Sequence, residues 1–422
     1  MDTTRRTILR GMAAAPVAAA AGGLALPGEA AAAERYRLKK RAAPTWASAY
    51  SYRRAINGLS SLLGGPVSLG EVLTRTPALK ADRVTRWPED QDDGTKPRPD
   101  KEPEELLYAF RWANADFVDK NWRPQGITTN YDANGSAPVT LLVSWYGRLA
   151  AEKQGARISV VSWNAAGDPT YQHVLLVEPY GLRYDGGDQY DFRESDLHAG
   201  GIAWYGNKLY VADSMVGTTG LRVYDLDRIF KVTKGPGLGR QADGTFHAHE
   251  YDYVLPQCYA YDASGSATQE FTFSQVSLDR TRRRPALLVS EYRPRGSCRL
   301  ARWELGSQSS GYLSSARSSW QAAANGEVRV QGAVRAADGR YYFASSHGTK
   351  KPGQLRSWRE GAATGRRESY LNIGCEDLSY SRINGRAALW TLGEYANDHE
   401  SDDPSDLDRR APFSRYVYAV RP

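Results

Sequence analysis

The sequence predicts an all-β fold, a five-bladed β-propeller with a small helical N-terminal extension, and three observations support this. A motif of about 20 residues returns five times between residue 124 and the end, each copy reading as two short strands joined by a turn. Further strand patterns follow each pair, rich in Val, Tyr, Trp, Leu and Thr. Gly, Asn and Asp punctuate these runs at short intervals, as turns require. A repeat of paired strands is typical of propellers and solenoids.

Each copy combines an inner strand with an apolar second strand. The copies are Gln125 to Trp145, Gly200 to Asp213, Gln275 to Glu291, Gln331 to Ser345 and Glu376 to Glu394. Third strands are expected at 157–163, 221–226, 299–305, 354–358 and 415–420, and fourth strands at 172–178, 251–255 and 367–371. Radial repetition of four-stranded units removes exposed sheet edges, which favours a propeller. A solenoid and a pair of β-sandwiches stay open as alternatives.

The chain divides into three segments. Residues 1–33 are interpreted as a twin-arginine signal peptide, because Arg5 and Arg6 precede a weakly apolar Ala/Gly run that ends in small residues. That run is too short and too poor in large apolar side chains to span a bilayer comfortably. We therefore expect a secreted bacterial protein with no membrane span. Residues 34–123 are expected to form a helical brace and linker, and residues 124–422 the propeller.

The brace is expected to contain two helices and a loop. The first helix covers 50–63, and the second runs from Pro103 to Trp122, where proline and two glutamates mark a helix start. A polar, Pro-rich loop lies between them at 87–100. Because the last repeat ends at its third strand, residues 81–87 are the candidate strand that closes the ring.

Charge and cysteine content limit the partners and cross-links. The formal net charge is +7, and the signal segment carries three Arg against two acids, so the remaining chain has a net charge of about +6. That mild excess favours acidic wall polymers over nucleic acid. Three cysteines allow at most one disulfide, for which Cys258 with Cys298 is the candidate pair, leaving Cys375 as a buried thiol.

Propeller geometry predicts where polar side chains converge. Inner strands begin, and second strands end, on the same face around the mouth of the central channel. The predicted catalytic carboxylates there are Glu291, Glu376, Glu394 and Asp213. The predicted ligand-binding residues are Gln125, Trp145, His198, Gln275, Tyr292, Gln331 and His347, with Trp145 and Tyr292 as stacking platforms. These groups suit a polar small molecule or a glycan, although polar side chains in a channel also satisfy one another and ordered water.

Paired carboxylates could carry glycosidic chemistry, in which one acid protonates the leaving oxygen and the other activates water or attacks directly. The region from residue 124 onward resembles five-bladed glycoside hydrolases and lyases in architecture, over about 300 residues. The resemblance implies carbohydrate as the substrate class. It departs at one position: the first blade of those glycosidases opens on an acidic residue, whereas this chain has Gln125.

Three further motifs are weaker. His247 and His249 have the spacing of two ligands on one strand face, but no third ligand is evident, and the metal content stays unknown. The acidic stretch 397–408 follows Glu394 and could bind Ca²⁺ through oxygen ligands, or simply be solvated. Residues 280–284, Arg-Thr-Arg-Arg-Arg, place positive charge on the face opposite the mouth, as a solvated turn or an acidic-polymer contact.

The leading hypothesis is a monomeric extracellular propeller that binds a polar small molecule or a glycan at its channel mouth. The first alternative is a carbohydrate-active hydrolase or lyase using two of the four carboxylates. The second alternative is a non-catalytic scaffold for protein partners.

Overall fold

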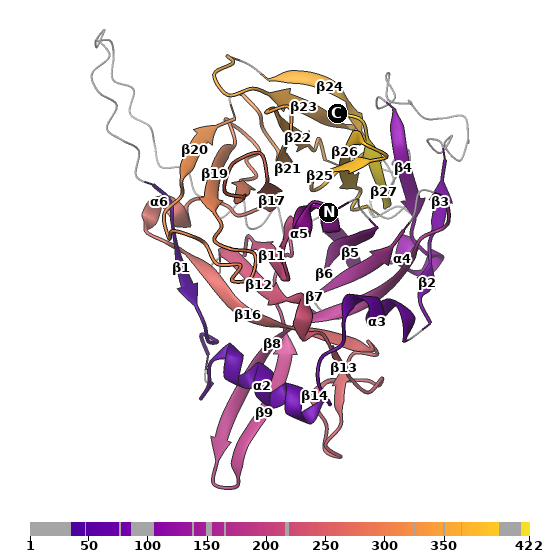
Figure 1. Cartoon of the computed structure of the whole chain (residues 1–422), viewed down its shortest axis with the longest axis vertical. Coiled ribbons are helices and arrows are strands. Elements are labelled where there is room, and N and C mark those ends of the chain that lie inside the picture. The colour runs from indigo at the N-terminus through magenta and orange to yellow at the C-terminus, as the bar shows by residue number, and fades with distance from the viewer. Residues whose placement is uncertain are drawn as a thin grey trace, which may run out of the picture.

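The computed structural model describes residues 35–46, 48–75, 77–85, 105–136, 139–148, 154–163, 166–215, 219–324, 326–348, 351–363, 365–395 and 415–422. Within these ranges the chain is mainly β-strand, arranged as antiparallel meanders around a common centre (Figure 1). The expected signal peptide, the loop at 87–100 and the acidic stretch 397–408 lie outside the described residues.

Two meanders belong to one 12-stranded sheet. Their strands are β5 (Trp122–Thr129), β6 (Thr140–Gly147), β7 (Ala156–Ser162) and β8 (Thr170–Tyr184), then β10 (Ile202–Tyr205), β11 (Lys208–Asp213), β12 (Gly220–Asp225) and β16 (Tyr253–Ser264). The meanders join where β16 runs parallel to β8, with Val254 paired to Leu175. The edges carry β1 (Arg37–Arg41), β2 (Leu79–Lys80), β9 (Gly187–Glu194) and β13 (Phe230–Lys231).

Three smaller sheets continue around the centre. One contains β17 (Gln275–Asp279), β18 (Ala286–Ser290), β19 (Arg299–Glu304) and β20 (Trp320–Ala323), and the next β21 (Val330–Arg335), β22 (Tyr341–Ser345), β23 (Gly353–Trp358) and β24 (Arg366–Leu371). The last contains β25 (Ser379–Ile383), β26 (Arg386–Leu392), β27 (Tyr416–Val420), β4 (Leu106–Arg111) and β3 (Asp82–Val84). Because β4 pairs with β27, the N-terminal part of the chain completes a sheet begun by its C-terminal part.

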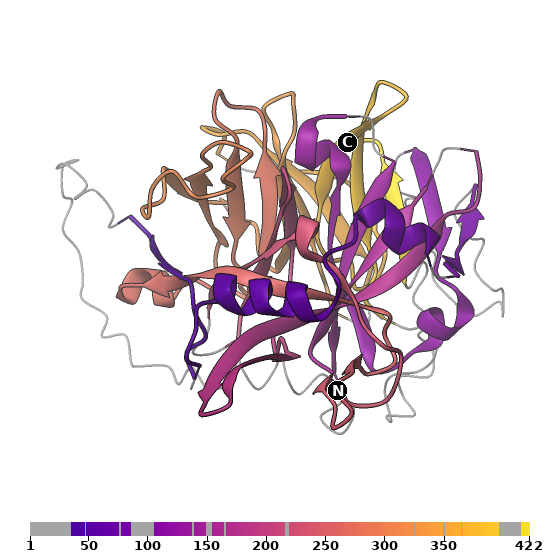
Figure 2. The ribbon, with the colours of Figure 1, turned by 60° about the horizontal axis from the view of Figure 1, so that its bottom comes forward.

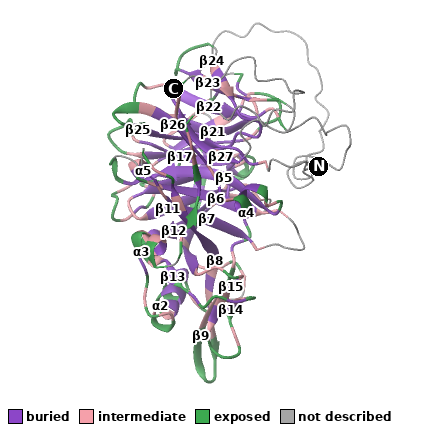
Figure 3. Ribbon diagram, turned by 90° about the vertical axis from the view of Figure 1, so that its right-hand side faces the viewer, coloured by how far each residue is buried: buried purple, intermediate pink, exposed green. Residues whose placement is uncertain are grey.

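The other helices and short strands flank this ring, and α5 (Asn130–Asn134) lies near its centre against β5, β10 and β25 (Figure 1). The flanking elements are α2 (Tyr52–Leu62), α3 (Leu69–Thr74), α4 (Asn114–Val118), α6 (Ser266–Gln269), the 3-10 helix η2 (Leu226–Arg228), β14 (Leu238–Arg240) and β15 (Phe246–Ala248). Helix α2 lies across β8, β9 and β16 (Figure 2) and buries Tyr52, Ile56 and Leu59. The β8–β9 hairpin projects from the body, and its tip is exposed (Figure 3). Among the described helices, none is long and apolar enough to cross a membrane.

The innermost strands β5, β10, β17, β21 and β25 touch one another in a complete circuit. Glycines permit the close approach: a Cβ on Gly126 would lie 2.4 Å from the carbonyl oxygen of Gly200, and one on Gly332 would lie 2.5 Å from the nitrogen of Leu378. Contacts that short exclude any larger side chain unless the backbone moves. Neighbouring inner strands therefore pack with their backbones in direct contact.

A buried carboxylate, Asp377, joins three of the inner strands at the centre of the ring. Its Oδ2 accepts the backbone N–H groups of Ile127 and Ile202, both at 3.0 Å. Its Oδ1 accepts the N–H of Leu378 at 2.9 Å. Burial raises the pKa of Asp377 well above its ordinary value, although the backbone N–H donors oppose that shift. Asp377 thereby satisfies donors that would otherwise be buried without partners.

The structure confirms a mainly β fold in a closed ring of strands, and every expected inner, second and third strand overlaps an observed strand. The count of five blades stays a prediction. The helix expected over Pro103–Trp122 is wrong, because residues 106–111 form β4 and pair with β27. The closing strand is therefore β4, and β3, which lies within the segment proposed for that role, pairs outside it.

The expected disulfide is also wrong, since all three cysteines are free thiols. Cys258 lies on β16, whereas Cys298 precedes β19 in a different sheet and packs in another apolar cluster. Cys375 is a buried thiol, as expected.

Replacing Asp377 by alanine tests its role at the centre. We expect Asp377→Ala to lower the free energy of unfolding by about 3 kcal/mol or more, because each buried N–H left without an acceptor costs about 1–3 kcal/mol. Urea unfolding measures this, with Asp185→Ala on the exposed hairpin tip as the control, expected within about 0.5 kcal/mol of the parent. A loss below about 1 kcal/mol for Asp377→Ala would show that the ring does not depend on this carboxylate.

A second carboxylate near the centre gives the protein a predicted pH response. Burial raises the pKa of Asp132 to about 6, against the hydrogen bonds that Thr128 and Ser379 donate to it. Between pH 4 and 6 the folded protein therefore holds a proton that the unfolded chain has lost, so stability falls as pH rises. Asp132→Asn should reduce this fall by about 3 kcal/mol in unfolding measured at pH 4 and pH 7. Parallel pH profiles for the parent and the variant would contradict the assignment.

Candidate functional site

Two glutamine–glutamate pairs gather where β5 and β21 begin and β26 ends. Gln125 donates its Nε2–H to Glu394 Oε2 at 2.9 Å, and Gln331 donates its Nε2–H to Glu376 Oε1 at 2.9 Å. All four side chains are buried, with at most 5% of any residue exposed. We call this group the Gln–Glu cluster.

A β-bridge brings the two carboxylates near one another. Cys375 and Gly393 form the bridge, and the Glu376 N–H donates to Leu392 while the Glu394 N–H donates to Gly374. Glu376 and Glu394 are therefore diagonal neighbours on one face of an antiparallel pair, a placement in which the backbone positions are about 7–8 Å apart. Their joint electrostatic effect is visible at Cys375, whose thiol pKa is raised by burial and then by both carboxylates.

Each glutamine keeps one carbonyl oxygen unused. Gln125 Oε1 and Gln331 Oε1 are buried and have no hydrogen-bond partner among the described residues. A buried acceptor without a donor costs about 1–3 kcal/mol. The cluster can therefore accept hydrogen bonds from a donor that the described protein groups do not supply.

One cationic and one aromatic side chain border the cluster. The Arg123 guanidinium lies 3.8 Å from Glu394 Oε2 and 5.3 Å from the centre of the Tyr395 ring. Burial raises the pKa of Tyr395 well above its ordinary value, and Glu394 raises it further. The Tyr395 phenol therefore stays protonated and can act as a hydrogen-bond donor beside Glu394.

The other two predicted catalytic carboxylates are held by arginines. Asp213 accepts from Arg222 at 2.8 Å, and Arg222 also reaches Asp262, which Arg41 of β1 contacts. Glu291 accepts from Arg299 through both oxygens at 2.7 Å. Neutralised, buried carboxylates of this kind are suited to fastening strands together.

The remaining predicted ligand residues are dispersed. Trp145 is fully buried in the apolar core beside Trp112, and its Nε1–H donates to Ser159, so the prediction of a stacking platform there is wrong. The Gln275 side-chain amide donates to the carbonyl oxygen of Ala333 and accepts from the Ser290 hydroxyl. The backbone N–H of Tyr292 donates to the Ser274 hydroxyl.

Two predicted histidines lie next to other groups. His198 stacks on Tyr146 with ring centres 4.3 Å apart. His347 is half-buried, and burial followed by the charge of Arg329 lowers its pKa.

A buried Ser–His–Asp arrangement was not predicted from the sequence. His173 Nδ1 lies 3.0 Å from Ser159 Oγ, and His173 Nε2 lies 3.0 Å from Asp116 Oδ1. Arg157 and Tyr171 also donate to Asp116, at 2.7 and 2.6 Å. The contact depends on the register of β7 and β8, which pairs Ser159 with His173 and which the sequence motifs did not specify.

Burial makes this group structural. Ser159 is fully buried, and its hydroxyl is already engaged by Trp145 Nε1 at 2.8 Å and His173 Nδ1 at 3.0 Å. Burial and then Arg157 lower the pKa of His173, which keeps the imidazole neutral and able to bond both neighbours. The group fastens α4 to the first meander.

The weaker motifs receive little support from their surroundings. In the part of the chain that is described, no three His, Cys, Asp or Glu side chains are grouped as metal ligands would be. His247 Nδ1 lies 2.8 Å from the carbonyl oxygen of Pro236, and His249 follows β15 with positive φ. Arg280 donates to the carbonyl oxygen of Asp132 at 2.8 Å and so anchors its turn to α5.

No family model and no curated protein matches this chain. Three solved structures are similar to it in part: a GH43_1 enzyme from Xanthomonas citri in complex with xylose, the RS223 β-xylosidase, and Pseudomonas fluorescens PhoX in complex with vanadate. Their identities are 11, 10 and 9%, and their TM-scores 0.35, 0.31 and 0.34. The alignments cover 72, 76 and 71% of this chain and 88, 94 and 88% of those chains. At such TM-scores the likeness carries no argument about activity.

Removing Arg222 tests whether Asp213 is structural. We expect Arg222→Met to cost about 3–5 kcal/mol in the free energy of unfolding, because it leaves a fully buried carboxylate without its ion-pair partner. Adding Asp213→Asn should restore at least half of that loss, as measured by denaturant titration. If Arg222→Met lowers the free energy of unfolding by less than about 1 kcal/mol, Asp213 is not mainly structural and stays a candidate for catalysis.

Proposed function

We propose that this chain is an extracellular five-bladed β-propeller that recognises a glycan or another polyhydroxylated small molecule at the Gln–Glu cluster. The observation that supports the proposal is a pair of buried amide oxygens, Gln125 Oε1 and Gln331 Oε1, that accept no hydrogen bond from the described protein groups. Each belongs to a glutamine that donates to a neighbouring glutamate carboxylate. Sugar hydroxyls are donors that match such acceptors.

The blade count in this proposal rests on the meanders and their inner strands. Each of the strands β5, β10, β17, β21 and β25 begins an antiparallel meander, and these strands contact one another in a closed circuit. A radial arrangement of such sheets leaves only short protected edges. We take the five meanders to be the five blades.

The acceptor-rich cluster also suits a hard cation. Carboxylate and amide oxygens are the ligands that Ca²⁺ prefers, and Ca²⁺ binding is compatible with simultaneous contact to sugar hydroxyls. Calcium is therefore included as a variable in the experiment below. Secretion through the twin-arginine route and a monomeric state belong to the proposal as well.

A second candidate function is hydrolysis or lyase chemistry on a glycan by Glu376 and Glu394. Their diagonal placement across the Cys375–Gly393 bridge favours it. Glycosidase carboxyl groups lie about 5 to 9.5 Å apart, and long side chains at diagonal positions are within reach of one another. One carboxyl would act as the acid and the other as base or nucleophile. Asp213 and Glu291 take no part, because arginines hold them.

The experiment is a binding and release assay on the secreted form. The protein from Glu34 onward is incubated with wall and plant polysaccharides, with and without calcium, and retention on each polymer and released oligosaccharides are measured. We expect Gln125→Ala and Gln331→Ala each to weaken retention about tenfold, since the loss of one good hydrogen bond is worth about 1.5 kcal/mol. Gln189→Ala, on the exposed face of β9, is the matched control and should bind as the parent does.

The glutamate variants separate the two functions. If the chain is an enzyme, Glu376→Gln and Glu394→Gln should each lower release by about 10²-fold or more while retention persists. If it only binds, no oligosaccharide is released by the parent. Retention that is equal in the parent, Gln125→Ala and Gln331→Ala would contradict the site, and absence of retention on every polymer would favour the scaffold hypothesis.

A further inference from the structure

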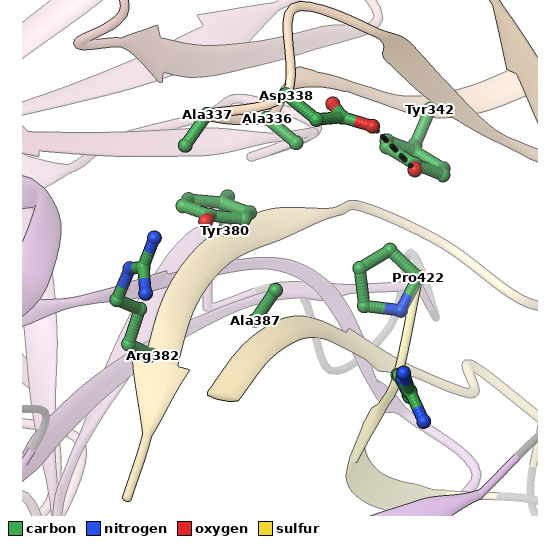
Figure 4. Close-up of a pocket in the computed structure, with 9 residues that line it drawn as sticks. Ala336, Ala337, Asp338, Tyr342, Tyr380, Arg382, Ala387 and Pro422 are labelled. Atoms are coloured by element: carbon green, nitrogen blue, oxygen red, sulfur yellow. Dashed lines mark hydrogen bonds between the residues drawn. The ribbon is translucent and has the colours of Figure 1, made fainter. Parts of the chain in front are cut away.

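A hollow lies at the opposite ends of the strands from the Gln–Glu cluster. It encloses about 380 Å³ between the β21–β22 turn, the end of β25, the start of β26 and the segment after β27 (Figure 4). Its lining residues are Ala336, Ala337, Asp338, Tyr342, Tyr380, Arg382, Ala387, Arg421 and Pro422. Strand β21 runs from near Gln331 to Arg335, so at about 3.3 Å per residue the turn lies some 13 Å or more from the cluster.

The walls of this hollow are small and aromatic. Tyr380 lies against the β21–β22 turn that carries Ala336 and Ala337, and Ala387 and Pro422 lie on the other side (Figure 4). The Tyr342 hydroxyl donates to Asp338 Oδ2 at 3.2 Å, which fixes that carboxylate at the rim. A volume of this size with one aromatic wall can accommodate a ring-shaped ligand.

The hollow contains an uncompensated positive charge. Arg382 donates to the carbonyl oxygen of Gly385 at 3.0 Å and has no carboxylate partner within the described ranges. The neighbouring cations differ, because Arg421 and Arg386 contact Glu105, and Arg340 contacts Asp338. Arg382 is exposed and lies beside the Tyr380 ring (Figure 4).

Positive charge continues along the same face. The turns after the first and third strands of neighbouring meanders carry further arginines, and a Cβ on Gly339 in the β21–β22 turn would lie 4.0 Å from both Arg335 and Arg359. Other exposed arginines at these strand ends are Arg282, Arg283 and Arg367, whereas Arg284 lies 3.9 Å from Glu304 and Arg366 lies 3.6 Å from Glu368. A face of this kind attracts an extended polyanion, and the hollow can then select one of its rings.

We propose that this hollow, the Tyr380–Arg382 pocket, is a second binding site, for a carboxylate-bearing sugar residue of an acidic polysaccharide. The apolar face of the sugar ring stacks on Tyr380, its carboxylate pairs with Arg382, and Asp338 accepts a hydroxyl. The surrounding arginines hold the chain that continues from this residue. The site is independent of the Gln–Glu cluster and does not require the function proposed for it.

The test is a titration of the protein from Glu34 onward with a galacturonic acid trimer, using calorimetry at low and at physiological salt. We expect Arg382→Gln to weaken binding at least tenfold, and Tyr380→Leu to weaken it severalfold with the fold checked by thermal unfolding. Arg282→Gln, on the same face but outside the pocket, is the matched control. Its affinity for the trimer should be within about twofold of the parent's, because salt screens the charge of an exposed arginine outside the pocket. Maltotriose, a neutral trisaccharide, should not bind.

Each other outcome overturns the proposal. An equal loss in Arg282→Gln and Arg382→Gln, with binding abolished by salt, would show only a diffuse cationic surface. Binding lost in Gln125→Ala but kept in Arg382→Gln would assign the trimer to the Gln–Glu cluster. Benzoate binding that needs Arg382, without binding of the trimer, would make an aromatic carboxylate the occupant and exclude the sugar.

Discussion

The ring of inner strands depends on one buried acceptor, the carboxylate of Asp377. It collects backbone N–H groups from β5, β10 and the start of β25, three segments that lie far apart in the chain. Buried N–H groups must be paired, so this single side chain links the strand ends while glycines let them approach. Gln125 and Gln331 lie on β5 and β21 of this ring, and Glu376 comes directly before Asp377, so that packing also sets the positions of these three residues.

Close pairing with arginine distinguishes Asp213, Glu291 and Asp116 from the two glutamates of the Gln–Glu cluster. Asp213, Glu291 and Asp116 each face a guanidinium at 2.7–2.8 Å, and each holds strands or helices together. Glu376 is held by an amide, and Glu394 by an amide with Arg123 only at 3.8 Å. The two glutamates of the cluster thus receive amide hydrogen bonds, and Glu394 has a buried arginine near it as well.

The same strands place different chemistry at their two ends. At one end amide and carboxylate oxygens offer acceptors, and at the other end arginines and tyrosines line a pocket. Because residues at opposite ends of one strand are held at a set distance, the two sites cannot merge. The Gln–Glu cluster and the Tyr380–Arg382 pocket therefore occupy separate places on the protein.

The sequence by itself determined the repeat, and with it the strands and their order. Period-two alternation and turn residues are local signals, which is why the expected strands overlap the observed ones. Residues 106–111 were misassigned because a short apolar run reads equally well as helix, and its partner β27 lies some 300 residues away in the chain.

The candidate site was predicted only in part. The repeat placed Gln125, Gln331, Glu376 and Glu394 together, since equivalent positions in a ring converge. It could not show that Trp145 packs in the core, that arginines occupy Asp213 and Glu291, or that His173 bridges Ser159 and Asp116. Those outcomes depend on contacts between residues distant in sequence, and only the tertiary structure decides which buried charge meets which partner.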